Sequence, residues 1–282
     1  MRILVTGATG VIGKKLIKSL VEDGYKVGGM TTSIAKVDIL QTLGATAYVG
    51  NILERKDVET ILQNFQPDMI IHQVTALQHG GIEDNAKVRT IGTRYLVDAA
   101  KKNNVKRVIA QSIAWAYEPG NTIAFEETPL DTNAAGKRKT TVDGIVALES
   151  AVQEIQNSVI LRYGALYGPG TWYDSQGLIA QQYLNNEVTI NDGITSFIHI
   201  EDAVAATIKA IEWEVGVYNI VDDEPAKNSI WGRYYAEQLQ ALPPKYFSGK
   251  IPWERGASNE KAKRCGVHLQ FPSWRQGFIS GK

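Results

Sequence analysis

The chain has one cysteine, no excess of charge and no long apolar run. Its 282 residues include a single cysteine, Cys265, so no disulfide can form within the chain. Thirty Lys and Arg residues balance thirty Asp and Glu residues, which argues against a nucleic-acid partner. No stretch approaches the roughly 20 apolar residues of a membrane-spanning helix, and no cleavable leader precedes the first expected strand. We therefore expect a cytoplasmic protein with no nucleic-acid or membrane partner.

The opening stretch organises the chain. An apolar strand at residues 2–6 runs into three glycines spaced three apart, Gly7, Gly10 and Gly13, and an amphipathic helix follows. In a strand-turn-helix of this kind, the first glycine permits a tight turn. The second lets a pyrophosphate approach the backbone, and the third lets the helix pack closely on the strand. The amides at the helix start would bind the pyrophosphate, so the stretch predicts a dinucleotide site.

Strands and helices alternate over the first part of the chain. Further strands are expected at residues 25–30, 45–50, 69–74, 107–111 and 158–163, with helices between them. This alternation predicts an α/β fold of Rossmann type, a doubly wound parallel sheet with a small C-terminal substrate lobe. We expect residues 1–170 to form the NAD(P)-binding domain, with later strands near 188–221 returning to it. Residues 171–282 are expected to form mainly the smaller lobe, including a hairpin at Asp192-Gly193.

Polar residues after the second strand bear on the choice of cofactor. An acidic residue would bind the adenosine ribose of NAD there, but the chain has three hydroxyl residues and a lysine instead. These groups favour NADP, with NAD as the alternative. Ligands bind at the carboxyl ends of parallel strands, so residues after the third and fourth strands join the site. The predicted cofactor-binding residues are Gly7, Thr9, Gly10, Val11, Ile12, Gly13, Thr31, Thr32, Ser33, Lys36, Asn51, Ile52, Val74, Thr75 and Ala76.

Three motifs in order resemble a known family. They are the glycine turn at residues 7–13, the strand exit at 161–170 and the segment Phe-Ile-His-Ile-Glu-Asp at 197–202. Together they resemble the extended short-chain dehydrogenase/reductase superfamily, in its NAD-dependent epimerase/dehydratase group. The likeness runs from Met1 to at least Val221, and the tail is similar to an atypical bacterial subgroup of oxidoreductases. The resemblance implies a Rossmann domain, a small substrate lobe and often a homodimer through helices near residues 84–103 and 140–155.

The resemblance also implies a catalytic set of Ser or Thr, Tyr and Lys, from which this chain departs. In the family the tyrosine exchanges a proton with the substrate, and a lysine four residues later lowers the pKa of that tyrosine. Aligning the corresponding helix places Thr141 and Ile145 at these two positions. We therefore expect the chain to have no Tyr-x-x-x-Lys pair anywhere. Lys137 and Lys139 could supply a displaced charge, or could lie in a solvated loop.

Three hydroxyl residues remain as catalytic candidates. Ser112 ends the fifth expected strand and could orient substrate, although it could also be a hydrogen-bonded strand end. Tyr117 and Tyr167 are the phenols expected on the nicotinamide side, with core packing as the alternative for each. His72 is interpreted as a hydrogen-bonded core residue. No cluster of His, Cys and carboxylate residues has metal-ligand spacing, so no metal site is expected.

The sequence leaves three functions open. The first is an NADP(H)-dependent oxidoreductase that acts on a small organic substrate by hydride transfer. The second is a redox-neutral epimerase, isomerase or dehydratase with a recycled nucleotide. The third is an NADP(H)-sensing binding protein without catalysis, because binding a cofactor is separable from using it.

Overall fold

The computed structural model describes residues 1–77 and 81–278. The chain forms two compact units, each built from three separate stretches. Unit 1 contains residues 1–112, 130–161 and 207–217, and unit 2 contains residues 113–129, 162–206 and 218 onward. The domain division expected from the sequence, at residue 170 with strands near 188–221 returning to the first domain, stays a prediction.

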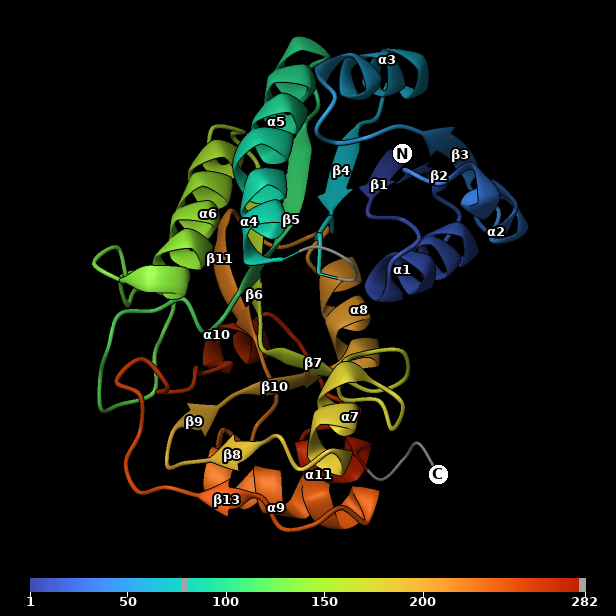
Figure 1. The fold of residues 1–282 in the computed structure, drawn as a ribbon. Coiled ribbons are helices and arrows are strands. Elements are labelled where there is room, and N and C mark those ends of the chain that lie inside the picture. Colours follow the sequence, from blue (N-terminus) through green and yellow to red (C-terminus); the bar gives the residue numbers. More distant parts are fainter. Residues whose placement is uncertain (78–80, 279–282) are drawn as a thin grey trace. The chain divides into compact units, whose positions relative to one another are not determined.

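A seven-stranded sheet has the strand order β11-β6-β5-β4-β1-β2-β3 (Figure 1). Strand β1 pairs in parallel with β2 and β4, and β2–β3 and β4–β5 are also parallel. Successive strands run outward from β1 to β3 on one side and from β4 to β6 on the other, so the order reverses between β1 and β4. This is the predicted Rossmann-type sheet. Its strands are β1 (Arg2–Thr6), β2 (Lys26–Thr31), β3 (Thr46–Val49), β4 (Met69–His72), β5 (Arg107–Ile113), β6 (Ser158–Tyr163) and β11 (Gly216–Ile220).

Helices connect these strands, and their apolar residues recur every three or four positions. In α3 (Arg55–Phe65), for example, Val58, Ile61, Leu62 and Phe65 are all buried on one face. One helical run between β4 and β5 contains a π-helical turn, η2 (Val88–Gly92), between α4 (Ile82–Lys87) and α5 (Thr93–Lys102). The others are α1 (Val11–Glu22), the 3₁₀ turn η1 (Ile34–Lys36), α2 (Val37–Thr42) and α6 (Gly136–Gln153).

Two adjacent glycines in β2 show that helices cover both faces of the sheet. A Cβ at Gly28 would lie 3.0 Å from the ring of Phe65 in α3. A Cβ at Gly29 would lie 3.1 Å from Leu40 in α2 and 3.2 Å from Ile17 in α1. Because successive residues of a strand point to opposite faces, α1 and α2 cover one face and α3 the other. Helices α5 and α6 share one apolar core with α3.

Unit 2 has an aromatic core and short strands. Large buried rings gather there, namely Tyr167, Tyr183, Phe197, Trp231, Tyr235 and Trp274. Edge-to-face pairs such as Tyr167 with Phe197, 6.1 Å between centroids, stabilise this core. The later elements are β7 (Ala165–Tyr167), α7 (Leu178–Leu184), β8 (Thr189–Ile190), β9 (Ile194–Thr195), β10 (Phe197–His199), α8 (Ile200–Lys209), β12 (Ala226–Lys227), α9 (Asn228–Leu239), β13 (Lys245–Tyr246), α10 (Glu260–Arg264) and α11 (Trp274–Gly277).

The predicted hairpin at Asp192-Gly193 is wrong. Strand β8 pairs with β13, β9 pairs with β12, and β10 pairs with β7. The turn forms locally, since the Asn191 side chain accepts a hydrogen bond from Gly193 N at 2.8 Å. The Asp192 carboxylate, however, accepts hydrogen bonds from Tyr246 and Gly249, which draws in a distant segment. Of the strands between residues 188 and 221 in the described chain, β11 alone joins the seven-stranded sheet.

His72 is a hydrogen-bonded core residue, as predicted. It ends β4, and its Nδ1 lies 2.7 Å from Thr6 Oγ1 while its Nε2 lies 3.1 Å from Thr93 Oγ1. Burial lowers the pKa of His72 to about 4. The neutral ring therefore links the ends of two strands to a helix.

This histidine predicts a loss of stability in mild acid. The folded-state pKa lies below the unfolded value, so stability is complete above pH 6.5 and is lost as the pH falls towards 4. Between pH 7 and pH 4.5 we expect the stability advantage of the wild type over His72→Gln to shrink by about 2 to 3 kcal/mol. Urea unfolding at the two pH values measures the change, and an equal advantage at both would contradict the prediction.

Candidate cofactor site and active site

The first turn of the chain leaves backbone amides open to an anion. Strand β1 ends at Thr6, and Gly7 takes a left-handed conformation with φ +73°. Gly10 N donates a hydrogen bond to Gly7 O at 3.0 Å, and α1 begins directly after Gly10. Since Gly10 has no side chain, none caps the first amides of α1 at this position. Those amides and the positive end of the helix dipole fit a pyrophosphate.

The atoms packed around this turn differ from one glycine to the next, so a side chain would have a different effect at each position. A Cβ at Gly13 would lie 2.2 Å from Gly7 O, and a Cβ at Gly7 would lie 2.7 Å from the carbonyl carbon of Gln73. At Gly7 and at Gly13, backbone atoms already occupy the space that a Cβ would need. A Cβ at Gly10 would meet only Gly7 O, at 3.2 Å, so its free side is where a ligand can approach. Val11 and the buried Ile12 follow as the first residues of α1.

Hydroxyl residues gather at the end of β2. Thr9 Oγ1 lies 3.3 Å from Thr31 Oγ1, which also accepts a hydrogen bond from Ser33 N at 3.3 Å. Thr32 is exposed, and Lys36 is partly exposed in η1. The glycine turn and the residues predicted to bind the 2′-phosphate of NADP therefore lie together. Residues 31–36 contain no carboxylate.

The predicted residues after β3 and β4 lie at the same edge of the sheet. Gly50 N, at the end of β3, donates to Thr31 O at 2.9 Å. The Asn51 side chain accepts a hydrogen bond from Leu53 N, and the buried Ile52 packs beside Gly92. After β4, Gln73 N donates to Thr6 O, next to the glycine turn. The following residues are the partly buried Val74, the exposed Thr75 and Ala76, whose amide donates to the Asn85 side chain at 3.0 Å.

Ser112 is buried and already paired. Its hydroxyl donates to the Glu149 carboxylate at 2.6 Å, and both side chains are almost fully buried. This bond joins β5 to α6 inside unit 1. The geometry supports the alternative that Ser112 is a satisfied hydroxyl at a strand end, and its catalytic role stays a prediction.

The two candidate phenols are buried in unit 2. Tyr117 OH donates to the Asn219 side chain at 2.5 Å, and burial raises the pKa of Tyr117 to about 12. Tyr167 OH donates to Ser273 O at 3.4 Å, and burial raises the pKa of Tyr167 as well. A phenol with a raised pKa holds its proton more tightly and is a poorer acid at neutral pH. Both contacts support packing roles, and catalysis by either phenol stays a prediction.

Helix α6 carries no phenol or ammonium where the resemblance implies them. Thr141 Oγ1 donates to Lys137 O at 3.4 Å, and Ile145 is fully buried. The helix begins at Gly136, so Lys137 and Lys139 lie in its first turn rather than in a loop. Lys137 is exposed and Lys139 pairs with Asp143 at 3.0 Å, so these lysines belong to a solvated surface.

The expectation that no Tyr-x-x-x-Lys spacing occurs in the chain is wrong, because Tyr246 and Lys250 have this spacing. These two residues lie outside any helix. Tyr246 OH donates to Asp192 at 2.8 Å, whereas Lys250 Nζ donates to Gly120 O at 2.9 Å. Their side chains therefore hydrogen-bond to two different segments of unit 2. They do not form a pair on one helical face, as the tyrosine and lysine of the family do.

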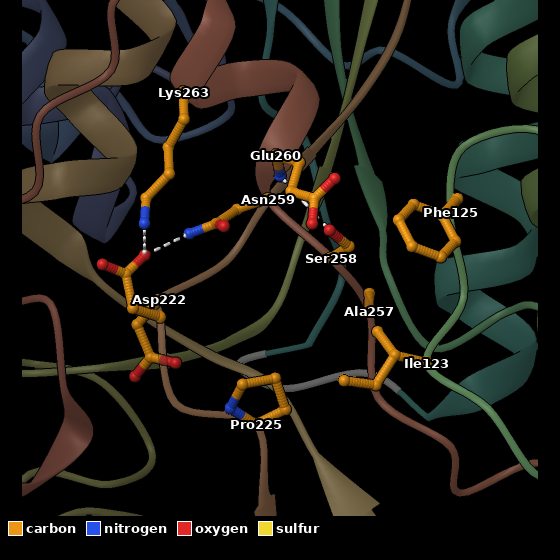
Figure 2. A pocket seen from close by; sticks show the side chains of 10 residues that line it. Ile123, Phe125, Asp222, Pro225, Ala257, Ser258, Asn259, Glu260 and Lys263 are labelled. Atoms are coloured by element: carbon orange, nitrogen blue, oxygen red, sulfur yellow. Dashed lines mark hydrogen bonds and ion pairs between the residues drawn. The ribbon is translucent and has the colours of Figure 1, made fainter.

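Unit 2 contains a pocket of about 280 Å³ that no sequence motif indicated (Figure 2). Ile123, Phe125 and Pro225 line its apolar side. On the polar side, the Asp223 carboxylate accepts hydrogen bonds from Asn259 at 2.6 Å and from Lys263 at 2.7 Å.

Asp222 lies beside this pair and is almost fully buried. Its Oδ2 has no hydrogen-bond partner among the described residues, and burial raises the pKa of Asp222 to about 8. The unfavourable burial of this carboxylate is the most marked electrostatic feature of the pocket.

Neither a metal site nor a membrane span emerges from residues 1–77 and 81–278. No group of three His, Cys, Asp or Glu side chains in these ranges could hold a metal ion. None of the helices there is both long and apolar enough to cross a bilayer.

The parallel sheet, its reversal beside β1 and the glycine turn at that reversal define a Rossmann-type dinucleotide-binding protein. Residues 3–221 match the model of the NAD dependent epimerase/dehydratase family. The chain belongs to this family.

Similar proteins include a reductase and two solved structures with bound nucleotide. A Streptomyces protein named 3-diazoavenalumate denitrifying reductase is 34% identical over 304 residues, covering 98% of this chain and 99% of that protein. The UDP-glucose 4-epimerase of Thermus thermophilus, solved with NAD, has a TM-score of 0.77 at 20% identity, covering 99% and 97% of the two chains. WbmH of Bordetella bronchiseptica, solved with NAD+, has a TM-score of 0.80 at 19% identity, covering 99% and 96%.

The glycine turn predicts two distinct effects of adding one methyl group. In Gly13→Ala the methyl would meet backbone atoms, and we expect a loss of roughly 2 to 3 kcal/mol in unfolding free energy. In Gly10→Ala the methyl would occupy the ligand's approach, so the melting temperature stays near wild type while stabilisation by NADP or NAD is lost. Thermal melts with and without nucleotide separate the two effects. Full stabilisation of Gly10→Ala by either nucleotide would refute the assigned role.

Asp222 predicts a second pH effect, opposite in sign to that of His72. A folded-state pKa above the unfolded value of 3.8 means that stability is lost as the pH rises towards 8. The neutral Asp222→Asn should gain stability over the wild type between pH 5 and 8, by about 1.4 kcal/mol for each pH unit at most. Chemical unfolding at both pH values tests this. Asp223→Asn is the control, because it removes an ion pair and should not stabilise the protein.

Proposed function

We propose that this protein is an NAD(P)H-dependent reductase that transfers hydride to a small organic substrate, with NADPH as the preferred donor. The observation that carries the proposal is the intact glycine turn, whose packing requires Gly7 and Gly13 and leaves Gly10 open. The hydroxyl residues Thr31 and Ser33, with Lys36 nearby, support NADPH, because they can donate to a 2′-phosphate. The full-length similarity to a reductase supports reduction as the reaction.

The residues of α6 favour a substrate that needs no proton from the enzyme. Reduction of a carbonyl produces an alkoxide that must be protonated, and neither Thr141 nor Ile145 can act as the acid. The bound cofactor would supply a hydride. An aryl diazonium compound needs only that hydride: a carbon–hydrogen bond forms, the carbon–nitrogen bond breaks, and N₂ leaves with the bonding electrons.

We therefore propose an aromatic diazo or diazonium compound as the substrate class. The Streptomyces relative is named as a denitrifying reductase of a diazo compound, and it aligns over nearly the whole chain. In this reaction NADPH is oxidised to NADP+, the arene is reduced, and no external proton is consumed. Gly7 to Gly13 would hold the diphosphate, and the residues after β2 would hold the adenosine end.

Isotope transfer tests the proposal directly. The protein is incubated with NADPH carrying deuterium on one face of C4 and with 4-carboxybenzenediazonium, and both benzoate and N₂ are analysed by mass spectrometry. We expect deuterium in the arene from one labelled face only, because a protein-bound nicotinamide presents one face whereas free NADPH presents both. Gly10→Ala is the matched control and should reduce transfer to the protein-free rate.

Two results would support the other functions instead. Nucleotide that stays bound and unchanged while a sugar nucleotide is epimerised would support a redox-neutral enzyme. Tight binding of NADPH without transfer to diazonium, carbonyl or enone compounds would support a sensing protein. Either result would overturn the hydride proposal.

We also propose that the protein is a cytoplasmic homodimer. Support for the dimer comes from the helical run between β4 and β5, where Ile82 and Ile91 expose 36% and 43% of their surface. Contiguous apolar patches mark surfaces that a partner covers, so the proposal requires these side chains to belong to one patch.

A further inference from the structure

Arg89 is a buried cation with an unpaired nitrogen. The residue lies in the π-helical turn η2 and exposes only 3% of its surface. Its Nε has no hydrogen-bond partner within residues 1–77 and 81–278. Burial lowers the pKa of Arg89 to about 10, so the guanidinium is still charged at neutral pH. A buried charge of this kind is unfavourable until an anion pairs with it.

The neighbours of Arg89 on its own helical run place it at the ligand edge of the sheet. Asn85 lies four residues before it and accepts the hydrogen bond from Ala76 N, just after β4. Thr93 lies four residues after it and contacts His72, the last residue of β4. Because residues four apart lie on one helical face, Arg89 stands between these two contacts, at the carboxyl end of β4.

Helix α6 leaves room for the arginine. A Cβ on Gly144 would lie 3.5 Å from Arg89 Cδ, so the aliphatic part of the arginine runs across this glycine. The next residue, Ile145, is buried and apolar. Further along α6 the buried carboxylate of Glu149 accepts the hydrogen bond of Ser112. Gly144 thus lets the aliphatic part of Arg89 pack closely against α6.

The strand order decides which part of a bound dinucleotide lies on this side. The adenosine end belongs at β2, where Thr31 and Ser33 lie. The order reverses between β1 and β4, so a dinucleotide that crosses this point places its nicotinamide on the β4 and β5 side. Arg89 lies on that side, where a substrate must meet the nicotinamide.

We propose that Arg89 binds a carboxylate of the substrate, which makes the substrate an organic anion. This inference rests on the proposed function and narrows its substrate class. A guanidinium offers parallel N–H donors that match the two oxygens of a carboxylate. Substrate binding would then neutralise a buried charge whose Nε has no hydrogen-bond partner among the described residues. Arg89 would hold the anion and would not itself donate a proton.

The test compares an acid with its amide. Benzoate and benzamide have nearly the same shape but differ in charge, and each is titrated into the protein saturated with NADP+, with binding followed by calorimetry. We expect the wild type to bind benzoate at least about tenfold more tightly than benzamide. Arg89→Gln should bind the two equally, and Arg89→Lys should retain part of the preference for the acid.

Matched controls show whether the effect is local. Arg94→Gln removes a cation one turn further along, whose guanidinium pairs with Asp98 and Glu154, and it should leave the preference for benzoate unchanged. Arg89→Gln should melt no lower than the wild type, because it removes a charge that is unfavourable to bury.

Two outcomes would overturn the inference: equal binding of acid and amide by the wild type, or an undiminished preference in Arg89→Gln. The readout is binding, so failure of the hydride reaction alone would refute the proposed function and leave the anion site standing. Transfer of deuteride without any preference for the acid would support the proposed function and refute the anion site.

Discussion

The contact between Gly13 and the carbonyl of Gly7 is the constraint on which the ligand edge depends. With no side chain at Gly13, α1 can start directly over the end of β1, and a Cβ there would lie 2.2 Å from Gly7 O. That approach aims the first amides of α1 along the carboxyl edge of the sheet. Gly7 in turn packs on the backbone after β4, so the same contact fixes the neighbouring strand end.

Elements whose structure is decided by nearby residues were predictable from the sequence. The bounds expected for β1 and β6 agree with the structure, because each strand is an apolar run that ends near a glycine. The hairpin predicted at Asp192-Gly193 does not form. The turn itself is present, but Tyr246 and Gly249, more than 50 residues away, donate hydrogen bonds to Asp192. The residues of a turn do not determine whether the two strands that flank it will pair with each other.

The candidate site shows the same limit. The sequence placed Ser112 and Tyr117 near strand ends, but their partners Glu149 and Asn219 lie 37 and 102 residues further along the chain. Whether a hydroxyl is free for chemistry depends on those partners. Arg89 gave no signal at all, since an arginine on an amphipathic helix is ordinarily solvated. In the structure it is buried, and α6 passes close to it at Gly144.

Cofactor binding and proton delivery are separable tasks. The glycine turn of this chain suits the first, and the residues aligned in α6 do not suit the second. The glycine turn is complete, whereas α6 presents Thr141 and the apolar Ile145. A substrate that loses N₂ supplies its own leaving group, so hydride alone completes the reaction. What such a substrate needs from the protein is orientation against the nicotinamide. A buried cation such as Arg89 would provide that orientation through its charge, which acts more strongly where water is excluded.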